Sequence, residues 1–224
     1  MRYSRNGRWR RYKQSRKLLR LGLYSGLLAT PLLVGVVPVT WAHDQHTLTI
    51  MSTVLEGAIH GRFNGSYQGH PNQAVFDDLV PGDIIFCHDA GGGYGYYTHC
   101  ALYVGNGKVV ESSNFREGTH VIPVQSFHGY DEVRVKRVLC SYPLRLRAAH
   151  YALAQVDRGY SIFGGLHDHN SMYCSKLVWS AFDAQGVQLC AQSRWIIPDD
   201  LAVSPKLQEV KTSSLGKGVL SRFK

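Results

Sequence analysis

The sequence contains no Cys-x-x-Cys pair, although it has five cysteines. Structural zinc sites and thioredoxin-like redox centres are commonly built on that spacing, so neither is supported. The glycine-rich stretch at 90–95 lacks the lysine and the helix start of a phosphate-binding loop, which favours a flexible connection or lid over a nucleotide site. Internal repeats and low-complexity linkers are also missing. We therefore predict a single domain that needs no cofactor.

Acidic residues are missing from the first 42 positions, which hold nine of the 25 Lys and Arg residues. Beyond that segment, 16 basic residues are balanced by 16 acidic ones, so the rest of the chain is formally neutral. The net charge of +9 therefore comes from the N-terminal segment alone. This distribution indicates no basic face for nucleic acid, and we predict no nucleic-acid partner.

Residues 1–42 have the layout of an export signal. A basic stretch precedes an apolar run at 21–39, and the small residue Ala42 offers a cleavage site. A retained membrane anchor is the alternative, because the apolar run approaches membrane-spanning length. In both cases we expect an exported domain, which is either periplasmic or extracellular, or is anchored in the membrane and faces outward. We expect no membrane contact other than through this N-terminal segment. Residues 43–75 are weakly patterned and form a lead-in to the predicted catalytic domain at 76–224.

Strand and helix patterns in the domain predict an α+β fold. Apolar alternation bounded by turn residues predicts strands at 83–87, 99–104, 108–112, 120–124 and 133–138. Helical periodicity predicts two helices, at 143–158 and 171–184. We therefore expect a small antiparallel sheet with helices packed beside it.

Cys174 opens the second predicted helix and is the strongest candidate for a nucleophile. A thiol at a helix N-terminus lies beside unpaired N–H groups and the positive end of the macrodipole, which lower its pKa. His99 begins a predicted strand and could keep the thiol as a thiolate, then protonate a leaving group. The backbone N–H of Cys174 is the expected oxyanion donor, whereas Tyr173 either packs, lines the cleft or touches the oxyanion. This pattern predicts a cysteine hydrolase or acyltransferase.

The place of Glu111 depends on the register of the hairpin around residues 105–107. With a three-residue loop, Glu111 lies diagonal to His99 on the same face of the sheet, within reach of a long side chain. With a two-residue Asn-Gly turn, the register shifts by one residue and Glu111 moves to the other face. We favour the three-residue loop. Ser112 and His120 are the alternatives for the residue that orients the histidine.

The remaining cysteines and histidines carry weaker signals. Cys100 directly follows His99, so its side chain points to the opposite face, and we predict a core residue rather than the nucleophile. The four cysteines other than Cys174 could form disulfides in an oxidising compartment or stay as buried thiols. The run at 167–169 (His-Asp-His) has no evident further ligand, so we predict no metal site.

Five segments together resemble the permuted branch of the NlpC-type papain-like hydrolases, the YiiX/YebB-like group, which is akin to lecithin:retinol acyltransferase. These segments are 79–85, His99 with 101–105, 109–111, 173–178 and 197–205. The histidine precedes the cysteine, which is the order that a circular permutation of a papain-like fold produces. The resemblance covers most of residues 79–210 and excludes the leader and the lead-in.

The resemblance implies a circularly permuted papain-like fold with Cys174 as the nucleophile, His99 as base and then acid, and Glu111 orienting His99. It implies an amidase or peptidase acting on amide bonds, with cell-wall peptides of peptidoglycan as the first expectation. Lipid-linked acyl groups are the second, since an acyltransferase or thioesterase would use the same three residues. A catalytically silent domain that binds a wall peptide or a partner is the alternative from another class, and the intact Cys174 and His99 count against it.

Overall fold

A computed structural model describes residues 46, 48, 50–52, 55, 72–90 and 95–210. The predicted export signal or anchor at 1–42 lies outside the described residues, as do most of the lead-in and of the glycine-rich stretch. Among the helices of the described part, none has the length and apolar character needed to cross a membrane.

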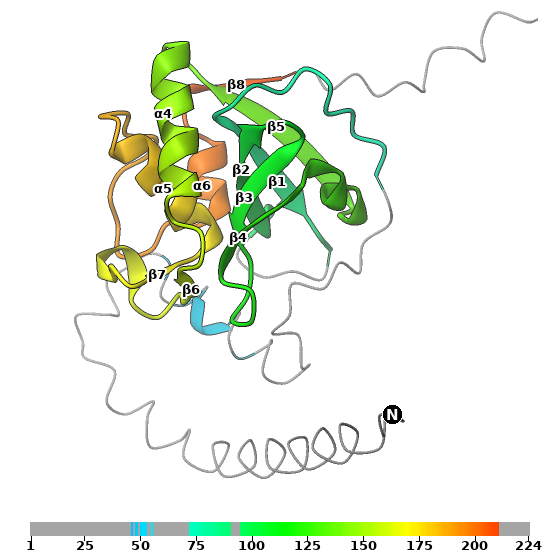
Figure 1. Ribbon diagram of the computed structural model, residues 1–224. Coiled ribbons are helices and arrows are strands. Elements are labelled where there is room, and N and C mark those ends of the chain that lie inside the picture. The colour runs from blue at the N-terminus through cyan, green and yellow to red at the C-terminus, as the bar shows by residue number, and fades with distance from the viewer. Residues whose placement is uncertain are drawn as a thin grey trace, which may run out of the picture. The chain divides into compact units, whose positions relative to one another are not determined.

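Six strands form one sheet in the order β4-β3-β2-β1-β5-β8, with every neighbouring pair antiparallel (Figure 1). They are β1 (Asp83–His88), β2 (His99–Gly105), β3 (Lys108–Ser112), β4 (Thr119–Pro123), β5 (Glu132–Val138) and β8 (Leu207–Glu209). A separate parallel pair consists of β6 (Gly159–Tyr160) and β7 (Ser171–Met172). The sheet places β2, β3 and β4 side by side at one edge, which matters for the site.

Within residues 72–90 and 95–210, the α-helices beside the sheet are α4 (Tyr142–Leu153), α5 (Cys174–Asp183) and α6 (Pro198–Ala202). Two 3-10 helices, η3 (Val124–Gly129) and η4 (Gly165–His167), lie in the connections. Helix α5 begins three residues later than the predicted start at residue 171, because β7 first pairs with β6. Tyr173 then forms an extended N-cap with φ −137° and ψ 164°. Cys174 is therefore the first residue of the helix.

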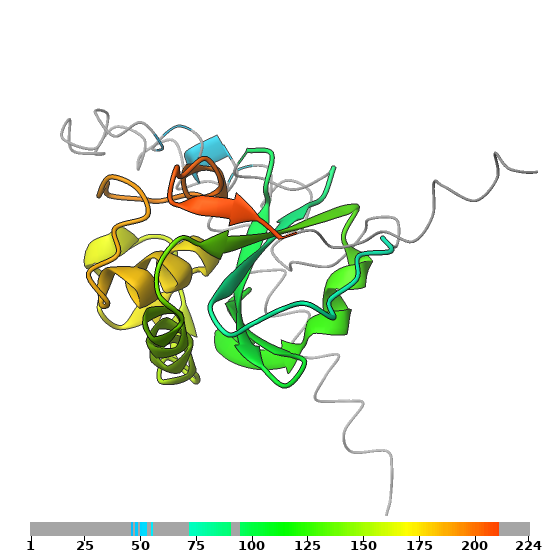
Figure 2. The same cartoon turned by 90° about the horizontal axis from the view of Figure 1, so that it is seen from above.

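The two faces of the sheet carry two separate apolar clusters. Alternate residues of β1 enter different clusters, with Ile84 and Phe86 on one side and Ile85 and Cys87 on the other. The first cluster packs against α4 and α5, and the second packs against η3, as Figure 2 shows from above. The predicted α+β fold, an antiparallel sheet with packed helices, is confirmed.

The hairpin between β2 and β3 differs from the prediction in its turn. Asn106 and Gly107 both have positive φ, 53° and 68°, as in a two-residue type I′ turn. Gly105 pairs with Lys108, but a bulge lies between Tyr103 and Gly105, after which Leu102 pairs with Val110. The predicted three-residue loop is therefore wrong.

The bulge restores the register that the three-residue loop was expected to produce. One extra residue on β2 shifts the pairing by one position, which reverses the shift caused by the two-residue turn. Continuing the ladder from Leu102 and Val110 places Ala101 opposite Glu111. Glu111 consequently lies on the same face as His99.

Candidate active site

Helix α5 presents Cys174 at a place that suits a negative charge. The first helical bond runs from the Leu177 N–H to the Tyr173 carbonyl, at 2.9 Å, so the N–H groups of residues 174–176 have no acceptor within the helix. The side of the helix that carries Cys174 is buried, and this residue is 5% exposed. Free N–H groups and the helix dipole both favour a thiolate here.

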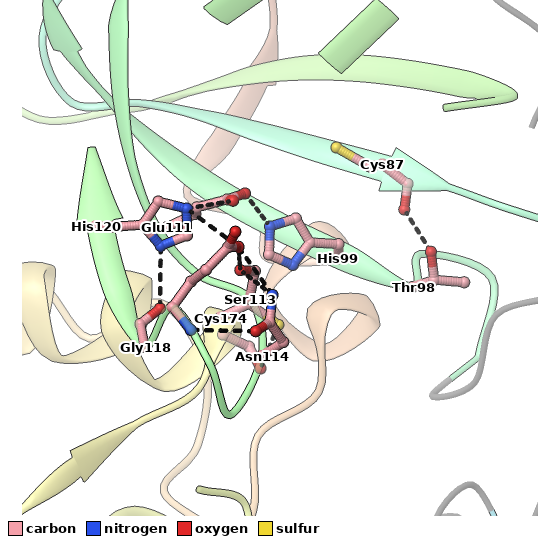
Figure 3. A network of polar contacts seen from close by, with 11 residues as sticks. Cys87, Thr98, His99, Glu111, Ser113, Asn114, Gly118, His120 and Cys174 are labelled. Carbon is pink, nitrogen blue, oxygen red and sulfur yellow. Dashed lines mark hydrogen bonds and ion pairs between the residues drawn. The ribbon is translucent and has the colours of Figure 1, made fainter. Parts of the chain in front are cut away.

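Three polar side chains form a row across neighbouring strands, one each from β2, β3 and β4 (Figure 3). The Nε2 atom of His99 lies 2.8 Å from one carboxylate oxygen of Glu111. The Nε2 atom of His120 lies 3.2 Å from the other. Glu111 and His120 are direct cross-strand partners, which explains their contact. His120, one of the two alternatives to Glu111, therefore contacts the Glu111 carboxylate. Ser112, the other alternative, follows Glu111 in β3, so its side chain faces the opposite side of the sheet.

The His99 ring is held between this carboxylate and the thiol. Its Nε2 atom faces the carboxylate of Glu111, and although burial lowers the pKa of the ring, Cys174 together with Glu111 raises it. Its face is stacked near Phe127 and Tyr130, with ring centroids 6.2 and 6.0 Å away. These contacts fix the ring plane, so the imidazole links the strand row to the start of α5.

The charges of the three groups support one another. Burial opposes a charge on His99, but its hydrogen bonds to Cys174 and Glu111 raise its pKa to about 10. Burial likewise acts against the Glu111 carboxylate, yet bonds from His120 and His99 lower its pKa to about 2. A bond from Cys100 lowers the pKa of Cys174, and its bond to His99 acts in the same direction against burial. The arrangement favours a thiolate, an imidazolium and a carboxylate together.

Cys100 is buried as predicted, but it also contacts the candidate nucleophile. Its thiol and its backbone N–H both lower the pKa of Cys174, because they stabilise a negative charge on the sulfur. The alternation of side chains along the strand correctly placed Cys100 on the face opposite His99, but the prediction named no role for Cys100 beside Cys174. The same alternation turns Cys100 toward the cluster that packs against α5, and this was the signal that could have revealed the contact.

A pocket opens at Cys174 and is lined mainly by apolar side chains. The lining residues are Ile50, Tyr160, Ile162, Tyr173, Cys174, Ser175, Ile196, Ile197 and Pro198. Ile50 belongs to the lead-in, which the family resemblance did not cover, so sequence reasoning missed it. Tyr173 does line the cleft, while its hydroxyl accepts a bond from the Ile196 N–H at 3.3 Å.

Hydrogen bonds from α5 hold the pocket wall in place. The Ser175 hydroxyl donates to the Ile196 carbonyl at 2.7 Å. The ammonium of Lys176, 3% exposed, donates to the carbonyls of Gly165, at 3.1 Å, and Ser171, at 2.9 Å, and to that of Asp168. The first turn of α5 thus carries both the thiol and the groups that anchor the surrounding loops.

The described residues include every cysteine and the run at 167–169. All five cysteines are free thiols, so none of the possible disulfides is formed. No group of three His, Cys, Asp or Glu side chains suited to a metal ion occurs in the described part, including the run at 167–169.

The chain is similar to a known protein family and to solved structures. The model of one protein family, described as "Permuted papain-like amidase enzyme, YaeF/YiiX, C92 family", matches residues 78–210, more than half of the chain. Among solved structures, the metalloprotein YiiX from Escherichia coli O157:H7 is 15% identical, with a TM-score of 0.47. That alignment covers 64% of this chain and 98% of the other. No curated protein matches the chain.

Proposed function

Because the chain belongs to the YaeF/YiiX family of permuted papain-like amidases, the family that its sequence predicts, we propose that it is an exported cysteine hydrolase that cleaves amide bonds. In this proposal Cys174 is the nucleophile, His99 the base and acid, and Glu111 the residue that orients His99. The observation that carries it is the pairing of His99 with Glu111, whose carboxylate lies 2.8 Å from the imidazole, together with Cys174 at the start of α5, whose pKa His99 helps to lower.

The reaction follows from the atoms at the site. The Cys174 thiolate attacks the carbonyl carbon, and the C–N bond breaks as the protonated His99 gives its proton to the leaving amine. The resulting thioester is then attacked by water, which passes a proton to His99 while the C–S bond breaks. The N–H of Cys174, which has no acceptor within the helix, is the natural donor to the oxyanion in both steps.

Amide bonds of cell-wall peptides are the first proposed substrates, since the proposed export would bring the domain to the wall. Transfer or hydrolysis of lipid-linked acyl groups is the second candidate, and it is supported by the apolar lining of the pocket beside Cys174. Incubation with purified muropeptides and with N-acyl amino acids, followed by mass spectrometry, separates the two. Release of peptide fragments favours the first, and release or transfer of the acyl chain favours the second.

The test of the nucleophile is iodoacetamide labelling of the full-length chain from pH 5 to 9, with each cysteine followed by mass spectrometry. Cys140 and Cys190 are internal controls, because both are more exposed than Cys174. Burial raises the pKa of Cys190 to about 11. Exposure alone would therefore make Cys190 react before Cys174, whereas thiolate content predicts that Cys174 reacts first. We expect Cys174 to react faster than either control at pH 6, by about tenfold or more.

Two substitutions complete this test. His99→Ala should slow the labelling of Cys174 at pH 6, because it removes the proton acceptor. His128→Ala is the matched control, since His128 bonds to the Ala74 carbonyl at 2.8 Å and is no part of the row. Slow labelling of Cys174 at every pH, unaffected by His99→Ala, would refute the enzyme and favour a silent binding domain.

A further inference from the structure

His120 is bonded through both of its ring nitrogens, and every partner is an acceptor. Nδ1 lies 3.2 Å from the carbonyl oxygen of Gly118. Nε2 lies 3.2 Å from Glu111 and 3.7 Å from Glu117. A neutral imidazole has only one N–H to donate, so both bonds are made only when the ring carries two protons. The placement of acceptors at both nitrogens therefore favours the cationic form of His120.

The surroundings of His120 keep it in this position. Its strand, β4, is an edge strand of the sheet, and the ring is partly exposed, at 23% of its side-chain area. Gly118 has a φ of +61°, and a side chain there would collide with the backbone of Arg158. The Thr119 N–H donates to that same Arg158 carbonyl at 2.8 Å. The Gly118 carbonyl, which accepts the hydrogen bond from Nδ1 of His120, is thus held in place by contacts outside the active site.

His120 also balances the charges of the row. In the reactive form proposed above, Cys174 is negative, His99 positive and Glu111 negative, which leaves one net negative charge in a buried site. A protonated His120 brings that sum to zero and alternates the signs along the row. Glu117, in the loop before β4, is the other charged group facing this ring, and its side chain is 60% exposed.

We infer that His120 is a positioning residue of this site, whose cationic ring holds Glu111 ionised and correctly placed, so that His99 stays protonated beside the Cys174 thiolate. This inference rests on the proposed function. It gives His120 no contact with the substrate, because its action passes through Glu111.

The experiment compares His120→Ala and His120→Gln in the full-length chain by the rate of iodoacetamide labelling at Cys174 from pH 5 to 9. His120→Ala should slow labelling at pH 6 about two- to tenfold, the range for the loss of one net hydrogen bond. Its pH profile should move to higher pH. His120→Gln should give an intermediate profile, because the amide can donate to Glu111 but carries no charge. Val121→Ala, the next residue of β4, is the control and should match the wild type.

The outcomes separate this inference from the function on which it rests. If wild-type Cys174 is not selectively reactive at pH 6, the proposed function and this inference both fail. If it is reactive and both His120 variants keep the wild-type profile, only the inference fails. Equal shifts in Val121→Ala would also overturn it, since they would indicate a general disturbance of β4. Should His120→Ala fail to fold, His120→Gln decides the result alone.

Discussion

Replacing Glu111 by glutamine removes the central charge of the row while keeping the shape of the side chain. Glu111 is 2% exposed, and its two oxygens accept bonds from His99 at 2.8 Å and from His120 at 3.2 Å. A glutamine amide has one acceptor and one donor group, so at one of the two rings a donor would face a donor. The variant therefore loses the charge and at least one of the two bonds.

The size of the effect follows from the pKa of the carboxyl. Burial alone would raise it, but the bonds from His120 and His99 hold the pKa of Glu111 at about 2, against an ordinary 4.5. A depression of this size corresponds to about 3 kcal/mol of stability. Because the folded-state pKa is the lower one, this stability is present above pH 4.5 and is lost as the pH falls through about 2. Roughly half of it should remain at pH 3.

Urea unfolding between pH 3 and 6 measures this directly, since the two histidines that contact Glu111, His99 and His120, have raised pKa values and stay protonated in the folded protein over that range. The free energy of unfolding of Glu111→Gln should be about 3 kcal/mol below that of the wild type at pH 6. The gap should shrink to about half at pH 3. Glu117→Gln is the control, because that side chain is 60% exposed and should give a small, flat difference. A gap for Glu111→Gln that does not change with pH would refute the reasoning.

Two further substitutions test the surroundings of the nucleophile. Cys100→Ala should slow iodoacetamide labelling of Cys174 at pH 6 several-fold, because the bond from Cys100 lowers the pKa of Cys174; Cys140→Ala should leave it unchanged. Lys176→Met should lower the free energy of unfolding in urea by about 2 kcal/mol, because three loop carbonyls lose a buried donor. Lys206→Met, on an exposed side chain, should change it little, and equal losses in the two lysine variants would contradict this account.

Most of the sheet was predictable because its patterns are local. Strands with period-two alternation were placed to within about one residue of their observed ends, as for β3 at Lys108–Ser112. The start of α5 was not, since the short pairing of β7 with β6 depends on a tertiary contact. Ile50 was missed for the same kind of reason: nothing near it in sequence indicates that it reaches the pocket.

The hairpin shows why a correct register can follow from an incorrect loop. The Asn-Gly pair forms the tight turn that its residue types favour, and on that ground alone Glu111 would face away from His99. Gly105, with a φ of +99°, allows the chain to bulge just before the turn. The two-residue turn and the bulge shift the β2–β3 register in opposite directions. The two shifts together decide on which face of the sheet Glu111 lies.

The resulting register of β2 and β3 determines the contacts on both faces of β2. With the observed register, His99 meets Glu111 on one face while Cys100 turns to the cluster beneath α5. Both residues then act on Cys174, since Cys100 and His99 each lower the pKa of its thiol. A slip of β3 by one residue would leave Cys100 in place but would take Glu111 away from the imidazole. The bulge is therefore as important to the proposed chemistry as any of the residues that carry it.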